Sequence, residues 1–324
     1  MMDSPQYVQP ILFLIFNRPK KTKQVFEAIR AQKPRQIFIA ADGPRSNVES
    51  DKASCDQTRS IIDEIDWDCS LQTLFRSENL GCKLAVSSAI DWFFNNVEMG
   101  IILEDDCLPN DSFFPFMDEL LQKYRGRSQI MMISGSRLMP QNQELEHGYE
   151  FTSHPIIWGW ATWRRAWSLY DVNMSDLPSF LQQQSLDRIS DDQDIRNYWI
   201  NCLIKTYLGE INTWDYPWMF SHLLHDGLGI CPNKNLVKNI GFDQDATHGD
   251  SPVMAKATSD THSLTIQSHP EQIAPNQNMD YESYLRFYNV KINSIQNPVL
   301  RLMKLIKKRR KTRKRLKQFL SKKS

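Results

Sequence analysis

The stretch from Gly100 to Asn110 constrains the fold more than any other part of the sequence. It runs from three apolar residues, Ile101 to Leu103, directly into three consecutive acids, Glu104 to Asp106. A short continuous apolar run before a breaker such as Pro109 predicts a buried strand. The three acids would then lie at the carboxyl end of that strand, where open α/β sheets bind their ligands.

These acids predict a cation at the same place. Three adjacent carboxylates repel one another, so the cluster is costly at the end of a buried strand unless something cationic neutralises it. Carboxylate oxygens suit Mg²⁺ or Mn²⁺, which proteins hold with one or two carboxylates together with substrate phosphates. A solvated acidic turn or a helix N-terminus is the alternative interpretation of an acidic triplet. The apolar run that precedes the triplet favours the metal site.

The charge of the chain is divided unevenly along its length. The net charge of +1 over 324 residues suits an ordinary soluble globular protein, one large domain or one domain with extensions. From Leu300 onward, however, there are 13 of the 39 basic residues and no acid, which leaves 26 basic against 38 acidic residues elsewhere. The body and the tail are therefore expected to have different partners.

The cysteines and the N-terminus both indicate a cytoplasmic protein. No metal-type spacing and no disulfide framework is visible among Cys55, Cys69, Cys82, Cys107, Cys202 and Cys231. The apolar run Ile11–Phe16 is too short for a signal core or a membrane span. We therefore expect a reducing cytoplasmic location, peripheral on the inner face of the plasma membrane.

Strand and helix patterns alternate over the first 135 residues. Continuous apolar runs predict buried strands at Ile11–Phe16 and Ile37–Ala41, and further strands are predicted at Leu71–Phe75 and Ile130–Ile133. Helical spacing predicts helices behind a cap at Thr22 and at Thr58–Ile65, Cys82–Phe94 and Phe113–Tyr124. This alternation predicts an α/β fold with a doubly wound, Rossmann-like, mostly parallel sheet. Its strand ends would bring Arg18, Asp42 and Asp106 together.

From Ile156 the sequence becomes dense in aromatic residues. They are Trp158, Trp160, Trp163, Trp167, Tyr170, Tyr198, Trp199, Trp214, Tyr216 and Trp218. Aromatic residues in this number favour a core over a ligand platform, because each buries a large area. Stacking aromatics nevertheless also bind sugars and bases, so this half could contact an acceptor. A helix is predicted over Arg164–Tyr170.

The C-terminal part divides into a polar connector and a basic tail. Residues 255–298 are rich in polar residues and are expected to be partly disordered. Residues 299–324 place Val299, Leu302, Met303 and Ile306 on one helical face among many Lys and Arg residues. This pattern favours a helix on an anionic membrane surface over a solvated tail or a nucleic-acid arm, since phosphate contacts need no apolar stripe. No nucleic-acid partner is expected.

Several motifs together resemble the nucleotide-sugar-binding half of a GT-A glycosyltransferase. In order along the chain they are Asn17-Arg18-Pro19, Asp42-Gly43, Glu78-Asn79-Leu80-Gly81 and Glu104-Asp105-Asp106. The later part is similar to the animal N-acetylglucosaminyltransferase I group in Gly159-Trp160, Trp214-Asp215-Tyr216-Pro217-Trp218-Met219 and His248-Gly249. The resemblance covers about residues 10 to 250. It implies a domain over 1–254, with a nucleotide-sugar half at 8–135 and an acceptor half at 136–254.

The resemblance implies roles for the acids and for Arg18. Asp106 would bind a divalent Mn²⁺ or Mg²⁺ directly, with Glu104 beside it, and Asp105 would face the donor ribose or sugar. Arg18 would meet the donor nucleotide or its diphosphate. Asp42 would accept hydrogen bonds from the uracil or ribose. From the sequence alone, Arg18 could equally be a surface arginine, and Asp-Gly is a common turn pair.

The remaining roles implied by the resemblance concern the diphosphate and the acceptor. Lys83 and His248 would lie near the diphosphate, and Asp215 would be the catalytic base. This chain has Tyr216-Pro217 where the family has a second acid after its Trp-Asp pair, and Thr247 where the family has serine. Asp215 could instead be a buried acid that accepts an indole hydrogen bond.

Taken together, these features predict a metal-dependent inverting glycosyltransferase of the hexosyltransferase class, from a bacterial polysaccharide pathway. Its donor would be a nucleotide-diphosphate sugar, with UDP favoured, and its acceptor a lipid-linked or cell-surface glycan. One metal-binding acid and one distant base are the minimum for this chemistry, and Asp106 and Asp215 supply them. The alternatives are a sugar-phosphate nucleotidyltransferase and a non-catalytic membrane or nucleic-acid binder that acts through its tail.

Overall fold

A computed structural model describes residues 9–138, 147–154, 156–182, 190, 192–242 and 260–286. His248 and the basic tail at 299–324 lie outside these ranges, as do 255–259 and 287–298 of the predicted connector. Every helix in the described ranges falls short of the length or the hydropathy that crossing a bilayer requires.

The described chain is built on an eight-stranded sheet with strand order β3-β2-β1-β4-β8-β6-β9-β7. The strands are β1 (Ile11–Ile15), β2 (Gln36–Ala41), β3 (Ser70–Phe75), β4 (Met99–Glu104), β6 (Ile130–Ser134), β7 (Tyr149–Thr152), β8 (Trp160–Trp163) and β9 (Leu228–Pro232). Parallel pairs join β1 to β2 and β4, β2 to β3, and β6 to β9. β8 runs antiparallel between β4 and β6, and β7 runs antiparallel to β9. The predicted α/β class with a large, mostly parallel sheet is confirmed, and it is consistent with a GT-A fold.

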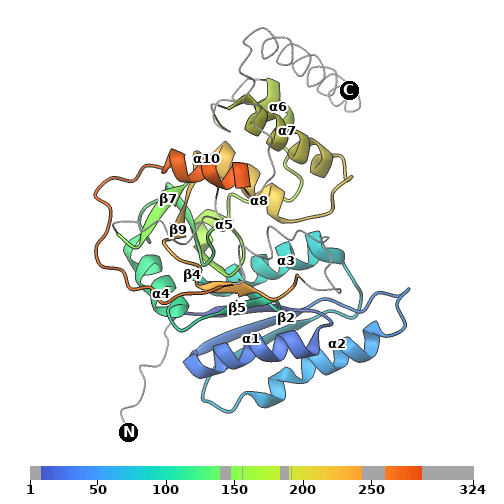
Figure 1. The fold of residues 1–324 in the computed structure, drawn as a ribbon. Coiled ribbons are helices and arrows are strands. Elements are labelled where there is room, and N and C mark those ends of the chain that lie inside the picture. The colour runs from blue at the N-terminus through green and yellow to red at the C-terminus, as the bar shows by residue number, and fades with distance from the viewer. Residues whose placement is uncertain are drawn as a thin grey trace.

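Helices cover both faces of this sheet (Figure 1). They are α1 (Pro19–Gln32), α2 (Asp51–Arg59), the 3₁₀ helix η1 (Ser60–Glu64), α3 (Gly81–Asn96), α4 (Phe113–Lys123), α5 (Arg164–Trp167), α6 (Leu177–Gln182), α7 (Gln193–Tyr207), α8 (Asp215–Leu224) and α10 (Gln277–Arg286). Side chains alternate along β1, so Phe13 packs with α1 and α4, whereas Leu12 packs with α3 and α8. The central strand β1 is apolar throughout because both of its faces are buried, whereas the edge strand β3 is partly exposed.

Three local predictions differ from the structure. The predicted helix at Thr58–Ile65 is instead the end of α2 followed by the 3₁₀ helix η1. Thr22 does not cap α1: the helix begins at Pro19, whose fixed φ suits the first helical position, and Thr22 is buried in the first turn. The helix predicted over Arg164–Tyr170 begins at Arg164 as α5 but ends at Trp167, and the unpredicted strand β8 at Trp160–Trp163 leads directly into it.

The aromatic residues of the second half are mostly core, as predicted. Trp160, Trp163, Trp214 and Trp218 are at most 2 % exposed. The rings of Trp160 and Trp214 stack with centroids 5.6 Å apart, between the sheet and α8. Trp158, Tyr198 and Tyr216 are partly buried and line the pocket described below. This packing fixes α8, and with it Asp215, against the sheet.

Residues 260–286 pack on the far end of the sheet. Pro275 forms a parallel bridge with Phe151 of β7, and Asp280 accepts a hydrogen bond from the Ser153 backbone N–H at 2.9 Å. Tyr284 of α10 is 1 % exposed and accepts a hydrogen bond from the Trp199 indole at 2.6 Å. This part of the predicted connector therefore contributes to the core of the domain.

Candidate active site

One large pocket lies at the carboxyl ends of β1, β2 and β4. Its volume is about 1410 Å³. Six of the eight predicted site residues line it, namely Arg18, Asp42, Glu104, Asp105, Asp106 and Asp215. Lys83 does not line it, whereas its neighbour Cys82 does. His248 lies outside the described residues.

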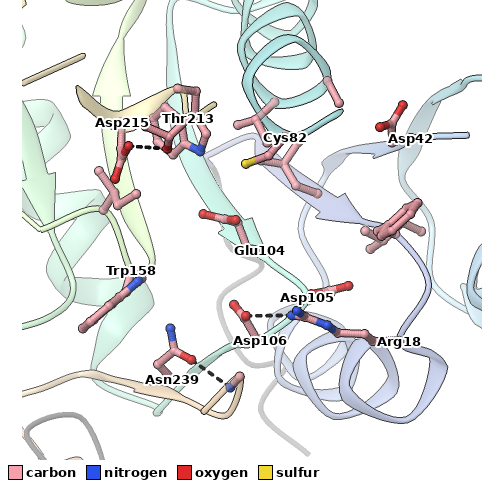
Figure 2. Close-up of a pocket in the computed structure, with 18 of the residues that line it drawn as sticks. Arg18, Asp42, Cys82, Glu104, Asp105, Asp106, Trp158, Thr213, Asp215 and Asn239 are labelled. Carbon is pink, nitrogen blue, oxygen red and sulfur yellow. Dashed lines mark hydrogen bonds and ion pairs between the residues drawn. The ribbon is translucent and has the colours of Figure 1, made fainter. Parts of the chain in front are cut away.

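The three acids lie at the carboxyl end of β4, and their side chains point in alternating directions. Glu104 is the last residue of the strand, and Figure 2 shows its carboxylate lying between those of Asp106 and Asp215. Asp105 points instead toward the β1–α1 loop, where Arg18 Nη1 is 3.4 Å from Asp105 Oδ1 and 2.9 Å from Asp106 Oδ2. Arg18, in the loop between β1 and α1, thus partly neutralises the negative charge of the cluster. This cluster and its pairing with Arg18 are the electrostatic centre of the pocket.

Burial and mutual repulsion change the ionisation of these acids. Burial, reinforced by Asp106, Asp105 and Asp215, raises the pKa of Glu104 to about 8. Burial and Asp106 also raise the pKa of Asp105 to about 7, although Arg18 opposes that shift. Full ionisation of the three acids is therefore unfavourable in this site, and a bound cation would offset their mutual repulsion.

The acids fit a divalent metal that is held jointly with a ligand. No group of three His, Cys, Asp or Glu side chains in the described ranges is arranged to hold a metal ion. Glu104 and Asp106 are the pair of acids on the same side of β4, so they would supply two carboxylates. Mg²⁺ and Mn²⁺ bind readily through one or two carboxylates when phosphate oxygens complete the coordination. The arrangement accommodates such a metal if the ligand carries phosphates.

Asp215 is held at the opposite wall of the pocket by its own helix. It is the first residue of α8, and its Oδ1 accepts hydrogen bonds from the Thr213 hydroxyl and, at 2.8 Å, from the Tyr216 backbone N–H (Figure 2). The helix N-terminus stabilises a negative charge at this position. Asp215 is therefore a fixed carboxylate that faces the pocket. The sequence indicated Asp215 but not Thr213, whose hydroxyl donates to the Asp215 carboxylate.

Asp42 has a role that the sequence did not suggest. Its carboxylate accepts hydrogen bonds from the backbone N–H groups of Gly43, Leu80 and Gly81 and from the Asn79 side chain, at 2.9–3.1 Å. These bonds attach the β2 end to the N-terminus of α3. The predicted contact of Asp42 with uracil or ribose stays a prediction, because most of its acceptor capacity serves this attachment.

Basic side chains surround the acids on one side of the pocket. Lys20 and Lys21 lie in the first turn of α1, Arg45 follows β2, and Arg76 follows β3; all of them line the pocket. The N-terminus of α1, which starts at Pro19, adds the positive end of a helix dipole. Cations that flank a carboxylate pair are suited to a ligand that carries both a metal and phosphates.

The loops on this side are tied to each other through Asp51. Arg45 donates to Asp51 at 2.6 and 2.9 Å, and Asn17 donates to it at 2.8 Å. The hydrogen bond from Arg45, opposed in part by burial, lowers the pKa of Asp51 to about 2. The loop after β1 and the loop after β2 are therefore held together at the mouth of the pocket. Nothing in the local sequence indicates this pairing.

The segment after β10 (Val237–Asn239) closes the pocket beside Asp106. β10 pairs antiparallel with β5 (Cys107–Pro109), and the Ile240 N–H donates to the Asp106 carbonyl at 2.8 Å. A Cβ atom added at Gly241 would lie 2.3 Å from Asp106 Oδ2, so a side chain there would require the segment or the carboxylate to shift. The sequence carries no clear signal for β10, because the strand is only three residues long.

Comparisons with known proteins give a likeness of fold. No family model matches the chain, and no curated protein matches it. Among solved structures, a UDP-glucose pyrophosphorylase bound to UDP-glucose aligns with 14% identity and TM-score 0.32, over 50% of this chain and 78% of that one. The apo form of a UDP-glucose pyrophosphorylase aligns with 12% identity and TM-score 0.39, over 78% and 97%. Mouse xyloside xylosyltransferase 1 aligns with 10% identity and TM-score 0.36, over 68% and 84%. The finer resemblance to the N-acetylglucosaminyltransferase I group stays a prediction.

Proposed function

We propose that this protein is a metal-dependent inverting glycosyltransferase. It transfers a sugar from a nucleotide-diphosphate donor, with UDP-linked donors favoured, to a hydroxyl group of a glycan or lipid-linked acceptor. The observation that carries the proposal is a single pocket with two walls of different chemistry. Acids flanked by cations form one wall, and Asp215, fixed at the start of α8, stands at the other.

Asp215 serves as the general base in this proposal. The acceptor oxygen forms a bond to the anomeric carbon of the donor sugar, and its proton passes to the Asp215 carboxylate. The bond between the anomeric carbon and the diphosphate oxygen breaks, and its electron pair leaves with the diphosphate. Thr213 and the Tyr216 N–H both bond to Oδ1, which fixes the orientation of the carboxylate before the reaction.

The other wall stabilises the departing diphosphate. Arg18, Lys20 and Lys21 carry positive charge at the N-terminus of α1, where negative charge would accumulate on the leaving group. Glu104 and Asp106 would hold the metal, and the metal when bound would neutralise charge on the diphosphate. Arg18 can shift from Asp106 toward a phosphate, because it already lines the pocket.

The connection between β1 and α1 favours sugar transfer over nucleotidyl transfer. A nucleotidyltransferase needs a glycine-rich loop after the first strand to surround a triphosphate with backbone N–H groups. Here only Phe16, Asn17 and Arg18 separate β1 from α1, and none is glycine. A base opposite the acid cluster also has a clear use in glycosyl transfer, where the acceptor hydroxyl must lose a proton.

Nucleotide sugars tested with and without Mn²⁺ examine this proposal directly. We expect a UDP-sugar to raise the melting temperature only when Mn²⁺ is present, and Asp106→Ala to abolish both this stabilisation and transfer. Lys52→Ala is the matched surface control, since Lys52 is exposed and remote from the pocket lining. Full turnover by the wild-type protein after complete chelation would rule out the metal role.

The basic tail motivates a further part of the proposal, a location on the inner face of the plasma membrane. Residues 299–324 would bind anionic lipid and bring the pocket to a membrane-borne acceptor. Deletion of these residues should abolish sedimentation with phosphatidylglycerol vesicles and preserve transfer to a soluble acceptor. Loss of every measurable function on deletion would instead favour a binding protein that acts through its tail.

A further inference from the structure

The charged residues of the pocket are confined to one part of it. Apart from Asp215, every charged side chain in the lining belongs to the segment from Arg18 to Asp106, which forms the ends of the first four strands. Beyond Asp215 the wall is made by Ile156, Tyr198, Trp199, Tyr216, Met219 and His222. We call these six residues the neutral end. They carry hydroxyl, indole, thioether and imidazole groups but no ionised group at neutral pH, because burial lowers the pKa of His222 to about 4.

Helix packing builds the neutral end as a continuous surface. Asp215, Met219 and His222 lie on one face of α8, at intervals of four and three residues. Tyr198 and Trp199 come from the neighbouring helix α7, and the Trp199 ring meets the Tyr216 ring edge-on with centroids 6.0 Å apart. The neutral end therefore begins next to the proposed base, where the reacting hydroxyl of an acceptor must lie.

His222 adds an uncharged hydrogen-bond acceptor to this surface. It is 1 % exposed, and its Nδ1 lies 3.4 Å from the Gly227 carbonyl oxygen, which can only accept. Nδ1 therefore carries the proton, and Nε2 presents a lone pair that has no hydrogen-bond partner among the residues described. Burial keeps the ring neutral by lowering its pKa to about 4. A ligand hydroxyl would satisfy Nε2 once neighbouring side chains adjust to it.

Such a surface selects against anions and in favour of hydroxylated rings. A phosphate or carboxylate here would lose its water without gaining a cation, and it would also face Asp215 and Glu104. A pyranose ring instead has an apolar face for the aromatic side chains and hydroxyl groups that donate to lone pairs such as Nε2. The chemistry of the lining therefore matches an uncharged sugar.

We propose that the acceptor group bound beside Asp215 is the uncharged terminal sugar of a glycan or glycoside, and that acceptors ionised near the reacting hydroxyl are rejected. This inference rests on the proposed glycosyltransferase function. It places the reaction after the step that attaches a first sugar to a lipid phosphate, because that step would bring a phosphate to the neutral end. The protein then extends an existing neutral glycan.

A panel of acceptors tests this with the wild-type full-length chain. The donor and Mn²⁺ are held at saturation, and kcat/KM is measured for neutral p-nitrophenyl hexosides, for the same hexosides carrying a 6-phosphate, and for the corresponding uronides. We expect kcat/KM to be at least tenfold higher for a neutral hexoside than for its phosphorylated or oxidised counterpart. Equal or faster transfer to the anionic acceptors, or transfer directly to a lipid phosphate, would overturn the inference.

A charge introduced into the neutral end provides a second test. Ile156 is only partly buried, so Ile156→Lys is expected to fold, and Leu169→Lys adds the same charge at an exposed position outside the pocket. Ile156→Lys should raise the ratio of phosphorylated to neutral acceptor use at least tenfold, and Leu169→Lys should leave this ratio unchanged. No change of the ratio in Ile156→Lys would count against the neutral end as the acceptor site.

Donor binding separates a failure of this inference from a failure of the proposed function. Absence of stabilisation by any nucleotide sugar with Mn²⁺, together with absence of transfer, would refute the glycosyltransferase itself. Donor stabilisation together with transfer to anionic acceptors would refute only the neutral end. Donor stabilisation without transfer to any neutral hexoside, and without contacts to one in saturation-transfer NMR, would refute it as well.

Discussion

At the scale of single residues, Glu104 connects the two walls of the pocket. Its carboxylate lies between Asp106 and Asp215, and burial together with these neighbours raises its pKa to about 8 from an ordinary value of 4.5. The unfolded chain releases this proton near the ordinary value, whereas the folded protein retains it until higher pH. The free energy of unfolding contributed by Glu104 therefore falls as pH rises between these two values.

Replacing Glu104 with glutamine should remove this penalty. In the presence of a chelator, we expect Glu104→Gln to raise the free energy of unfolding at pH 8 by about 1–2 kcal/mol and to change it little at pH 5. Urea denaturation at the two pH values measures the difference. Glu78→Gln is the control, since Glu78 is exposed and outside the pocket lining. Equal effects of Glu104→Gln at both pH values would show that ionisation of Glu104 does not lower the free energy of unfolding.

Asp215 allows a test that separates chemistry from binding. Asn keeps the shape and the acceptor oxygen that Thr213 and the Tyr216 N–H use, but it cannot take a proton. Asp215→Asn should therefore retain stabilisation by donor and Mn²⁺ while transfer falls at least ~100-fold. Initial rates and thermal shifts measured on the same preparation check both parts. An unchanged transfer rate would remove Asp215 as the base.

At the scale of elements, the attachment of α3 to the end of β2 depends on Asp42. Its carboxylate accepts from the N–H groups of Leu80 and Gly81, which are otherwise unsatisfied at the helix start. Asp42→Ala should lower the free energy of unfolding by about 1–2 kcal/mol, because it removes these bonds and a favourable charge at the helix N-terminus. Urea denaturation measures this loss. A stability equal to that of the wild type would mean that Asp42 serves ligand binding alone.

The segment after β10 supports Asp106 by approaching it closely. Gly241→Ala would place a methyl group 2.3 Å from Asp106 Oδ2, so the segment or the carboxylate must move. We expect weaker dependence of donor binding on Mn²⁺, with a dissociation constant for Mn²⁺ at least ~10-fold higher. Gly126→Ala is the matched control, since nothing lies within 4 Å of a Cβ atom there. Identical Mn²⁺ binding in both variants would contradict the role of Gly241.

The sequence predicted the elements whose signals are local. β1, β2, β4 and β6 are continuous apolar runs, and the acids after β4 made the site visible because their position at a strand end follows from that run alone. β8 was missed because Trp160–Trp163 contains no turn signal that separates it from the following helix, and because its pairing with β4 depends on residues about 60 positions away. Such pairings are set by tertiary packing rather than by local propensity.

The limits of sequence reasoning at the site have the same origin. Asp42 was visible as an acid after a strand, but its partners Leu80 and Gly81 lie 38 and 39 residues away. Lys83 was expected near the diphosphate because it follows Gly81, yet the helical turn directs Cys82 into the pocket instead. The link between Asn17 and Asp51 joins two loops that lie 34 residues apart in the sequence and meet only in the folded chain.

At the scale of the whole molecule, the pocket lies where the two halves of the fold meet. The parallel strands and α1 provide the acids and cations, while α7 and α8 provide Asp215 and the neutral end. Residues 260–286 pack against β7 and the residue that follows it, through the Pro275–Phe151 bridge and the hydrogen bond from the Ser153 N–H to Asp280. In the proposed function, this arrangement would separate a charged region for the donor from an uncharged region for the acceptor, with the reacting atoms between them.

The identity of the products tests the central claim most directly. The full-length protein is incubated with Mn²⁺, a UDP-sugar and a neutral hexoside, and nucleotides and glycosides are quantified by chromatography, with a parallel reaction that contains pyrophosphate. The account predicts one UDP released for each glycosylated hexoside, no product after chelation, and no UTP when pyrophosphate is added. Formation of UTP and a sugar 1-phosphate in the presence of pyrophosphate, without transfer to the hexoside, would contradict it.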